Sequence, residues 1–377
     1  MDSKSVMKLS RSIRIMFGVV GVALLVFLIR SVGPRRLTEN IHLLGWGWLA
    51  ILGLGGVSHV VKTWAWQFTF DRRYATIPFR RLLGVRLAGE GISQLTVAGQ
   101  VVGETTRALM LRSTVPLVGG ASSVVLDRSL YLLTALLLMM VGALLSLVAL
   151  GLSPAVRVYE VFIVVVLVGF MLLVGMTFKR RWPVLSAALQ ALGRLSVMRA
   201  WAESRRAGVQ EVETIIYSCC TGGGRALWFS LGLNLIGHAL SVAEVYLILW
   251  FLGVNVTLLG AFFIEVLTKL VNLVGAIIPG NVGAYEGGNM IILHALGLSG
   301  ATGLALAIAR RLRGLFWAGI GLGVLLAHGL SRRPTVSIPE VGPLELESSS
   351  LNGTTKPCPE SIHSRNTFSN QSFLPEG

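Results

Sequence analysis

Charged side chains are scarce in this sequence. Only 14% of its 377 residues are Asp, Glu, Lys or Arg, whereas 53% are hydrophobic, and a soluble globular domain carries about 25% charged residues. This shortage excludes a soluble or disordered chain, and its apolar runs indicate a membrane protein. The sequence has 18 acidic residues and 33 basic ones, so its formal net charge is +15. Because apolar runs dominate, we assign the basic excess to a lipid bilayer and expect no nucleic-acid partner.

Cysteine is also rare, and Cys219, Cys220 and Cys358 are too few for a disulfide framework. No spacing of Cys and His matches a metal site, so we expect neither a metal nor a cofactor. The sequence lacks a phosphate-binding Gly-Lys-Ser/Thr loop and a Gly-x-Ser-x-Gly nucleophile motif. These absences lead us to predict that the protein is not an enzyme.

Six apolar stretches approach or exceed the length of about 20 helical residues that a ~30 Å hydrocarbon layer requires. They are residues 13–29, 46–68, 118–150, 158–178, 226–252 and 301–330. Basic residues crowd the segments after the second, fourth and last stretches, and those after the second are Arg72, Arg73, Arg80, Arg81 and Arg86. Cytoplasmic loops carry such an excess. We therefore expect a multi-pass protein of the cell (plasma or inner) membrane with both termini in the cytoplasm.

Two further apolar stretches, residues 88–112 and 258–297, are interrupted by glycine and proline, which weaken a continuous helix. The interrupting residues include Gly99, Gly103, Pro279, Gly280, Gly283 and Gly287. Non-helical backbone at membrane depth is tolerated only inside protein or beside a water-filled cavity. We predict that each stretch forms a re-entrant hairpin, which enters and leaves on the same side of the membrane.

The remaining segments define the domain organisation. Residues 179–225 carry leucines at helical spacing and predict an amphipathic helix on the inner membrane face. Residues 334–377 are rich in Ser, Pro, Asn and Glu without periodicity, which is typical of a disordered tail. The transmembrane domain is therefore expected to span residues 1–333.

A shift of 182 residues aligns two halves of the chain, at about 46–150 and 228–332. It places Glu104 on Glu286 and Arg128 on Arg310, and it superimposes the apolar stretches and both interrupted segments. The expected orientations of the corresponding spans are opposite. We predict an all-α polytopic fold with about six full spans and two broken-helix hairpins in an inverted repeat. Such repeats bind substrate near the membrane midplane.

Ionisable side chains within the apolar body are costly, so they usually face a cavity or a partner. The candidates for a polar substrate path are Glu104, Arg107, Asp127, Arg128, Lys269, Glu286 and Arg310. The alternative is that acids and bases pair only to hold the hairpins together. For Lys269 we favour a local ion pair with Glu265, four residues earlier. Four tryptophans at the ends of span 46–68, including Trp66, are expected to anchor it at the interfaces.

These residues carry a family likeness. Residues 103–111 read Gly-Glu-Thr-Thr-Arg-Ala-Leu-Met-Leu and precede Asp127-Arg128, and residues 279–287 read Pro-Gly-Asn-Val-Gly-Ala-Tyr-Glu-Gly and precede Arg310. The two patterns resemble the signatures of the lysylphosphatidylglycerol synthase transmembrane, or flippase-like, family. The likeness covers about residues 10–332. It implies a domain that moves lipid between leaflets, as in larger relatives that also carry an aminoacyltransferase domain, for which the short tail leaves no room.

The leading hypothesis is a lipid flippase for an anionic or polyprenyl-type lipid whose head group follows the polar path. One alternative is a membrane enzyme that acts on lipid head groups, with Glu104 or Glu286 as general base. The other is a non-transporting partner of an enzyme of lipid or cell-envelope synthesis. Leaflet exchange in reconstituted vesicles separates the three.

Overall fold

The computed structural model describes residues 42, 44–71, 77–95, 99–149, 154–195, 198–222, 224–275 and 283–331. In these residues every regular element is an α-helix, so the predicted all-α class is confirmed. The helices are α3 (Gly47–Gln67), α4 (Phe79–Leu95), α5 (Gly99–Leu111), α6 (Leu117–Ala149), α7 (Pro154–Arg180), α8 (Val184–Gly193), α9 (Arg199–Gly222), α10 (Gly224–Phe251), α11 (Leu258–Gly275), α12 (Ala284–Ala295) and α13 (Gly300–Ser331). The predictions for span 13–29, for tail 334–377 and for Pro279 and Gly280 lie outside the described residues.

Three described helices are long and apolar enough to cross a membrane, at Leu117–Val148, Val161–Arg180 and Gly224–Phe251. The second of these has no buried residue, so its apolar side chains have the exposure expected of a lipid-facing helix. The two other predicted spans within the described residues also form helices, α3 and α13.

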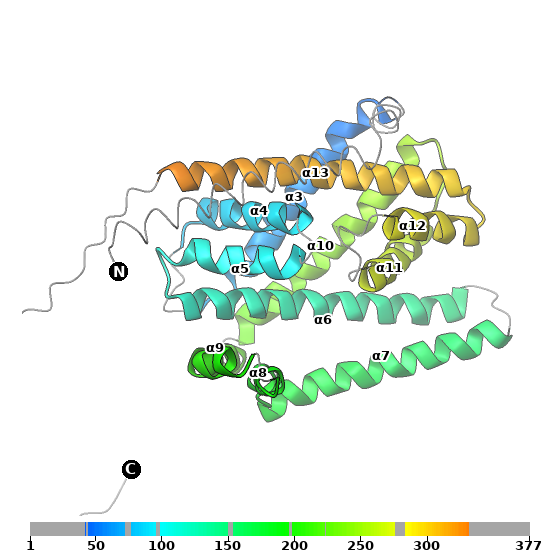
Figure 1. Ribbon diagram of the computed structural model, residues 1–377. Coiled ribbons are helices and arrows are strands. Elements are labelled where there is room, and N and C mark those ends of the chain that lie inside the picture. Colours follow the sequence, from blue (N-terminus) through cyan, green and yellow to red (C-terminus); the bar gives the residue numbers. More distant parts are fainter. Residues whose placement is uncertain are drawn as a thin grey trace, which may run out of the picture. The chain divides into compact units, whose positions relative to one another are not determined.

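The helices after the first apolar span follow an order that occurs twice. A long helix, two short packed helices and a second long helix make up α3–α6, and the same order makes up α10–α13. Figure 1 shows α4 and α5 between α6 and α13 toward one end, and α11 and α12 toward the other, while α3 and α10 cross behind. One apolar core joins α3–α6 around Leu82 and Leu111, and another joins α10–α13 around Ile264 and Leu293.

The two interrupted segments form the short helix pairs α4–α5 and α11–α12. The first pair begins at Phe79, earlier than the predicted residue 88, because α4 continues through the arginine-rich segment. The Ser93 hydroxyl at the end of α4 donates a hydrogen bond of 2.7 Å to the carbonyl of Gly99, which begins α5. The end of α4 therefore contacts the start of α5.

Of three glycines predicted to interrupt helices, one lies at a helix end and two lie inside helices. Gly283 lies at a helix end, because its φ of 81° is in the left-handed region and it is the N-cap of α12. The prediction that Gly103 and Gly287 interrupt helices was wrong, since both lie inside helices. A Cβ at Gly103 would overlap the Gly89 carbonyl oxygen of α4, so this glycine permits close helix packing.

A second glycine, Gly321 of α13, packs closely against α4, and this contact leads to a stability prediction. A Cβ at Gly321 would overlap the carbonyl oxygen of Leu87, whereas a Cβ at Gly319 would meet nothing within 4 Å. We expect Gly321→Ala to lower the free energy of unfolding by about 1–3 kcal/mol through overpacking. Gly319→Ala should be neutral or stabilising by up to about 1 kcal/mol, from helix propensity. Thermal unfolding in detergent measures both, and equal effects would contradict the packing argument.

Candidate functional site

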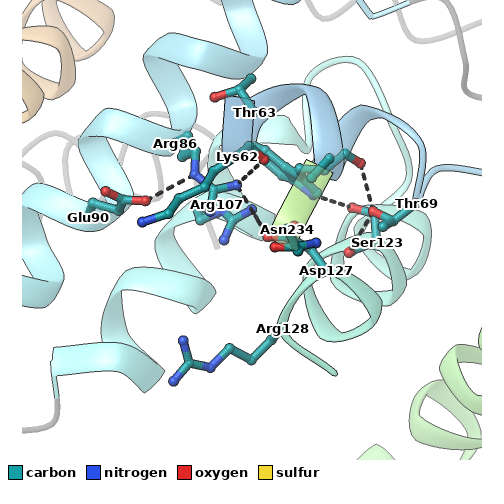
Figure 2. A network of polar contacts seen from close by, with 12 residues as sticks. Lys62, Thr63, Thr69, Arg86, Glu90, Arg107, Ser123, Asp127, Arg128 and Asn234 are labelled. Carbon is teal, nitrogen blue, oxygen red and sulfur yellow. Dashed lines mark hydrogen bonds and ion pairs between the residues drawn. The ribbon is translucent and has the colours of Figure 1, made fainter. Parts of the chain in front are cut away.

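Asp127 of α6 is the centre of a buried polar network. Its Oδ2 accepts a hydrogen bond of 2.7 Å from the Arg107 guanidinium of α5 and lies 3.4 Å from that of Arg86 on α4. Arg86 also donates to Glu90, at 3.0 Å, and to the carbonyl of Lys62, at 2.8 Å (Figure 2). The network joins α3, α4, α5 and α6. Two predicted site residues, Arg107 and Asp127, are thus brought together as a pair.

Arg86 was assigned to a cytoplasmic loop on sequence alone, and that assignment was wrong. The residue lies within α4 and is only 7% exposed. The prediction that Trp66 is an interfacial anchor was wrong too, because this side chain is fully buried. Its indole lies against the Arg107 guanidinium, with 3.9 Å between the Arg107 Cζ and the ring centroid, and its Nε1 donates to Ser123 Oγ at 3.3 Å. Trp66 therefore supports the buried arginine.

Arg128 and Glu104 form a second, more accessible pair. The Arg128 Nε lies 3.4 Å from Glu104 Oε1, and their side chains are 32% and 30% exposed. In Figure 2 the Arg128 side chain extends apart from the Asp127 network. Its Cζ lies 5.2 Å from the centroid of the Tyr131 ring, one turn along α6. This pair is the part of the first cluster that is best placed to meet a ligand.

A corresponding cluster joins α10, α11 and α13. Arg310 of α13 lies 2.7 Å from Glu265 and 3.5 Å from Glu244, and Arg313 lies 2.9 Å from Glu244. The predicted local pair also forms, with 2.8 Å between Lys269 Nζ and Glu265 Oε1. Arg310 and Lys269 therefore share one carboxylate. Both bases are nearly buried, with side chains 9% and 11% exposed.

Glu286, the remaining predicted site residue, has two partners. Its Oε2 accepts a hydrogen bond of 2.8 Å from the Gly283 backbone N–H, so it caps α12, and its Oε1 lies 2.7 Å from Arg311 of α13. A carboxylate at a helix N-terminus is also favoured by the helix dipole. Glu286 therefore anchors α12 to α13.

Apart from the His59 imidazole, whose Nδ1 lies 2.9 Å from Glu90 Oε2, the two clusters each hold four basic and three acidic side chains. The first comprises Lys62, Arg86, Arg107, Arg128, Glu90, Glu104 and Asp127. The second comprises Lys269, Arg310, Arg311, Arg313, Glu244, Glu265 and Glu286. Each cluster thus carries one formal positive charge that its own carboxylates do not neutralise.

Tyr131 lies where the two clusters approach each other. The Lys62 Nζ of α3 is 5.9 Å from its ring centroid, and the His238 ring of α10 is 5.0 Å away. Lys269 of α11 also interacts electrostatically with Tyr131. His238 is held by Thr134, at 3.2 Å between Oγ1 and Nε2. Cationic side chains of α3 and α6, Lys62 and Arg128, therefore lie beside this phenol.

A hollow of about 200 Å³ lies away from these charges, at the turn between α10 and α11. Its lining contains no charged side chain and includes Tyr246, Trp250 and Asn255. Within the described part of the chain, no group of three His, Cys, Asp or Glu side chains could hold a metal ion. The charged clusters therefore remain the strongest candidates for a functional site.

The family model described as Lysylphosphatidylglycerol synthase TM region matches residues 14–323. The chain belongs to this family. The match confirms the resemblance stated above and, with the apolar helices, makes the chain a multi-pass membrane protein related to lipid metabolism or transport. No curated protein and no solved structure matches the chain. Both charged clusters fall within the matched region of this synthase transmembrane family.

Proposed function

We propose that the chain moves an anionic or polyprenyl-type lipid between membrane leaflets. The observation that carries this proposal is the positive excess of each charged cluster, within helices of a membrane family. A charge at the bilayer centre costs about 2.5–3.5 kcal/mol on insertion scales, so an uncompensated one is retained where it has a function. A phosphate head group supplies the missing negative charge, while its acyl or prenyl tails stay in the lipid.

Arg128 and Lys62, which lie beside the Tyr131 ring, form the proposed head-group site. Arg128 is the most exposed of the predicted bases, and its planar guanidinium can bind two phosphate oxygens. Lys62 has no carboxylate within ion-pair distance among the described residues, so its amino group is available to an anion. The other predicted residues, Arg107, Asp127, Arg310, Lys269 and Glu286, hold the helices that present these groups.

The repeated helix order supports an inverted repeat as the framework for transport. The offset of 182 residues that relates Arg128 to Arg310 also relates Arg86 and Arg107 to Thr268 and Asn289. The latter two are bonded across α11 and α12, with 2.9 Å between Thr268 Oγ1 and Asn289 Oδ1. Discontinuous helices at matching places in two halves are typical of transporters that bind substrate between the halves.

Localisation belongs to the same proposal. We place the chain in the plasma or inner membrane, with both termini in the cytoplasm, where an enzyme of lipid synthesis is a candidate partner. The burial of Arg86 removes one residue from the orientation signal, but the basic segment that follows α7 retains it. Labelling of single cysteines introduced at exposed Arg112 and Arg157 tests the orientation, because the two are expected on opposite sides.

Leaflet exchange of fluorescent lipids in reconstituted vesicles tests transport. We expect Arg128→Gln to slow the exchange of a phosphate-bearing lipid about 10- to 100-fold, because a hydrogen bond to a charged group contributes about 1.5–3 kcal/mol. Arg157→Gln on α7, which removes an equally positive but exposed residue, should not change the rate.

Three results would contradict the proposal or part of it. Exchange no faster than in empty vesicles, for anionic, zwitterionic and polyprenyl lipids alike, would exclude transport. Unchanged exchange by folded Arg128→Gln would exclude the assigned site. Chemical conversion of the lipid, detected by mass spectrometry, would instead indicate an enzyme.

A further inference from the structure

The segment around α8 and α9 is strongly basic. Residues 179–206 contain a single acidic residue, Glu203, and seven basic ones, which are Lys179, Arg180, Arg181, Arg194, Arg199, Arg205 and Arg206. Glu203 pairs with Arg199 on the surface, at 3.2 Å. We call residues 179–222 the basic hairpin. It holds the same seven basic residues and three acidic ones, Glu203, Glu211 and Glu213, so its formal charge is +4.

The basic hairpin is a built element rather than a loose linker. Helix α8 begins at Val184 without a side-chain cap from its own N-cap residue. Instead, Glu213 of α9 accepts a hydrogen bond of 2.7 Å from the Leu185 backbone N–H and another from the Ser186 hydroxyl. A buried carboxylate on a helix N-terminus satisfies free N–H groups and matches the helix dipole. Glu213 therefore fixes α8 against α9.

The outward side of the hairpin combines apolar and basic side chains. Trp182, Val184, Leu192, Leu195 and Trp201 are each between 38% and 58% exposed. On α9, Trp201 and Arg205 are both exposed and lie four residues apart, so they share one helical face. Exposed aromatic and basic residues on one face are typical of a helix that lies in the membrane interface.

The orientation of the hairpin agrees with such a position. In Figure 1 α8 and α9 are seen end-on, whereas α6 and α7 run across the picture. Two helices that cross the spans at a steep angle lie along the membrane when the spans cross it. Ile216 of α9 packs on Leu126 and Leu130 of α6, so the hairpin is anchored beside Asp127 and Arg128.

We propose that the basic hairpin is a binding surface for anionic phospholipid head groups of the leaflet on which it lies. Trp182 and Trp201 insert at the head-group level, and Arg194, Arg199 and Arg205 bind the phosphates. The proposal extends beyond lipid transport, because this surface binds lipid that is not moved. It also holds if the central cations prove to have no substrate.

Native mass spectrometry of the purified full-length protein, titrated with phosphatidylglycerol or phosphatidylcholine, tests the proposal. Each basic residue near a membrane surface adds about 1 kcal/mol of attraction, or about fivefold in affinity. We expect wild type to retain phosphatidylglycerol preferentially and the triple variant Arg194→Gln/Arg199→Gln/Arg205→Gln to lose at least about tenfold in affinity for it. The matched control is Arg80→Gln/Arg112→Gln/Arg157→Gln, which removes the same charge from exposed positions outside the hairpin.

The outcomes are distinct. Loss in the hairpin variant alone, with unchanged thermal unfolding, supports the site. Equal loss in both triple variants would mean attraction by net charge only and would overturn it. A dimer that dissociates in Trp201→Ala, with lipid retention unchanged, would make the surface a contact between two copies. None of these measurements depends on transport, so a protein that moves no lipid can still support the binding site.

Discussion

Asp127→Ala is expected to lower the free energy of unfolding by about 3–5 kcal/mol, because it leaves buried cations without their counter-charge. Asp127 accepts from Arg107 at 2.7 Å and lies 3.4 Å from Arg86, and all three residues are at most 7% exposed. Arg86 keeps Glu90, whereas Arg107 keeps only its contact with Trp66 among the interactions described above. Unfolding of the purified protein in mixed micelles measures the loss.

Two matched variants separate the charge effect from general damage. Glu203→Ala removes an exposed carboxylate whose pair with Arg199 contributes at most about 1 kcal/mol. The double variant Arg107→Met/Asp127→Leu removes both charges and should be less destabilised than Asp127→Ala, because buried pairs replaced together are often neutral. If Asp127→Ala were as stable as Glu203→Ala, the network would not be a stabilising element.

The parts of this fold that depend on local sequence could be predicted. Apolar runs of sufficient length predicted α3, α6, α7, α10 and α13, because a bilayer requires such runs. The pair Glu265–Lys269 could also be predicted from local sequence, because residues four apart lie on one helical face. The Arg86–Glu90 pair has this spacing too, but the basic residues beside it indicated a loop.

The pairs that define the two clusters could not be predicted from spacing. Arg107 and Asp127 lie on α5 and α6, and Arg310 and Glu265 lie on α13 and α11, so each contact depends on how separate helices pack. The repeat did not supply them either. At the offset of 182, Asp127 corresponds to Ala309, and the central carboxylate of the second cluster is on α11 instead.

Glycines and tryptophans were ambiguous for a related reason. A helix break and a close helix contact both require a missing Cβ, so Gly283 and Gly103 look alike in the sequence. A tryptophan near the end of a span is compatible with the membrane interface and with the protein core alike. The buried Trp66 ring contacts the Arg107 guanidinium and its N–H bonds Ser123, and neither residue is close to it in sequence.

Glu265→Gln should also lower the free energy of unfolding strongly, and the size of the loss should depend on the lipid present. Glu265 is the shared partner of Lys269, at 2.8 Å, and Arg310, at 2.7 Å. Among the described carboxylates, its neutralisation leaves Arg310 with Glu244 alone, at 3.5 Å, which Arg313 also contacts. We expect a loss of about 3 kcal/mol in the free energy of unfolding in zwitterionic micelles.

An anionic lipid should restore part of that stability, because a ligand that binds only the folded protein stabilises it in proportion to its occupancy. At 100 times its dissociation constant, the lipid would contribute about 2.7 kcal/mol. Glu265→Gln carries one more uncompensated cation than wild type, so its stabilisation by phosphatidylglycerol should exceed that of wild type. The control Glu265→Gln/Lys269→Gln restores the charge balance and should respond as wild type does. An identical response of all three proteins would show that the cluster's cations do not bind anionic lipid.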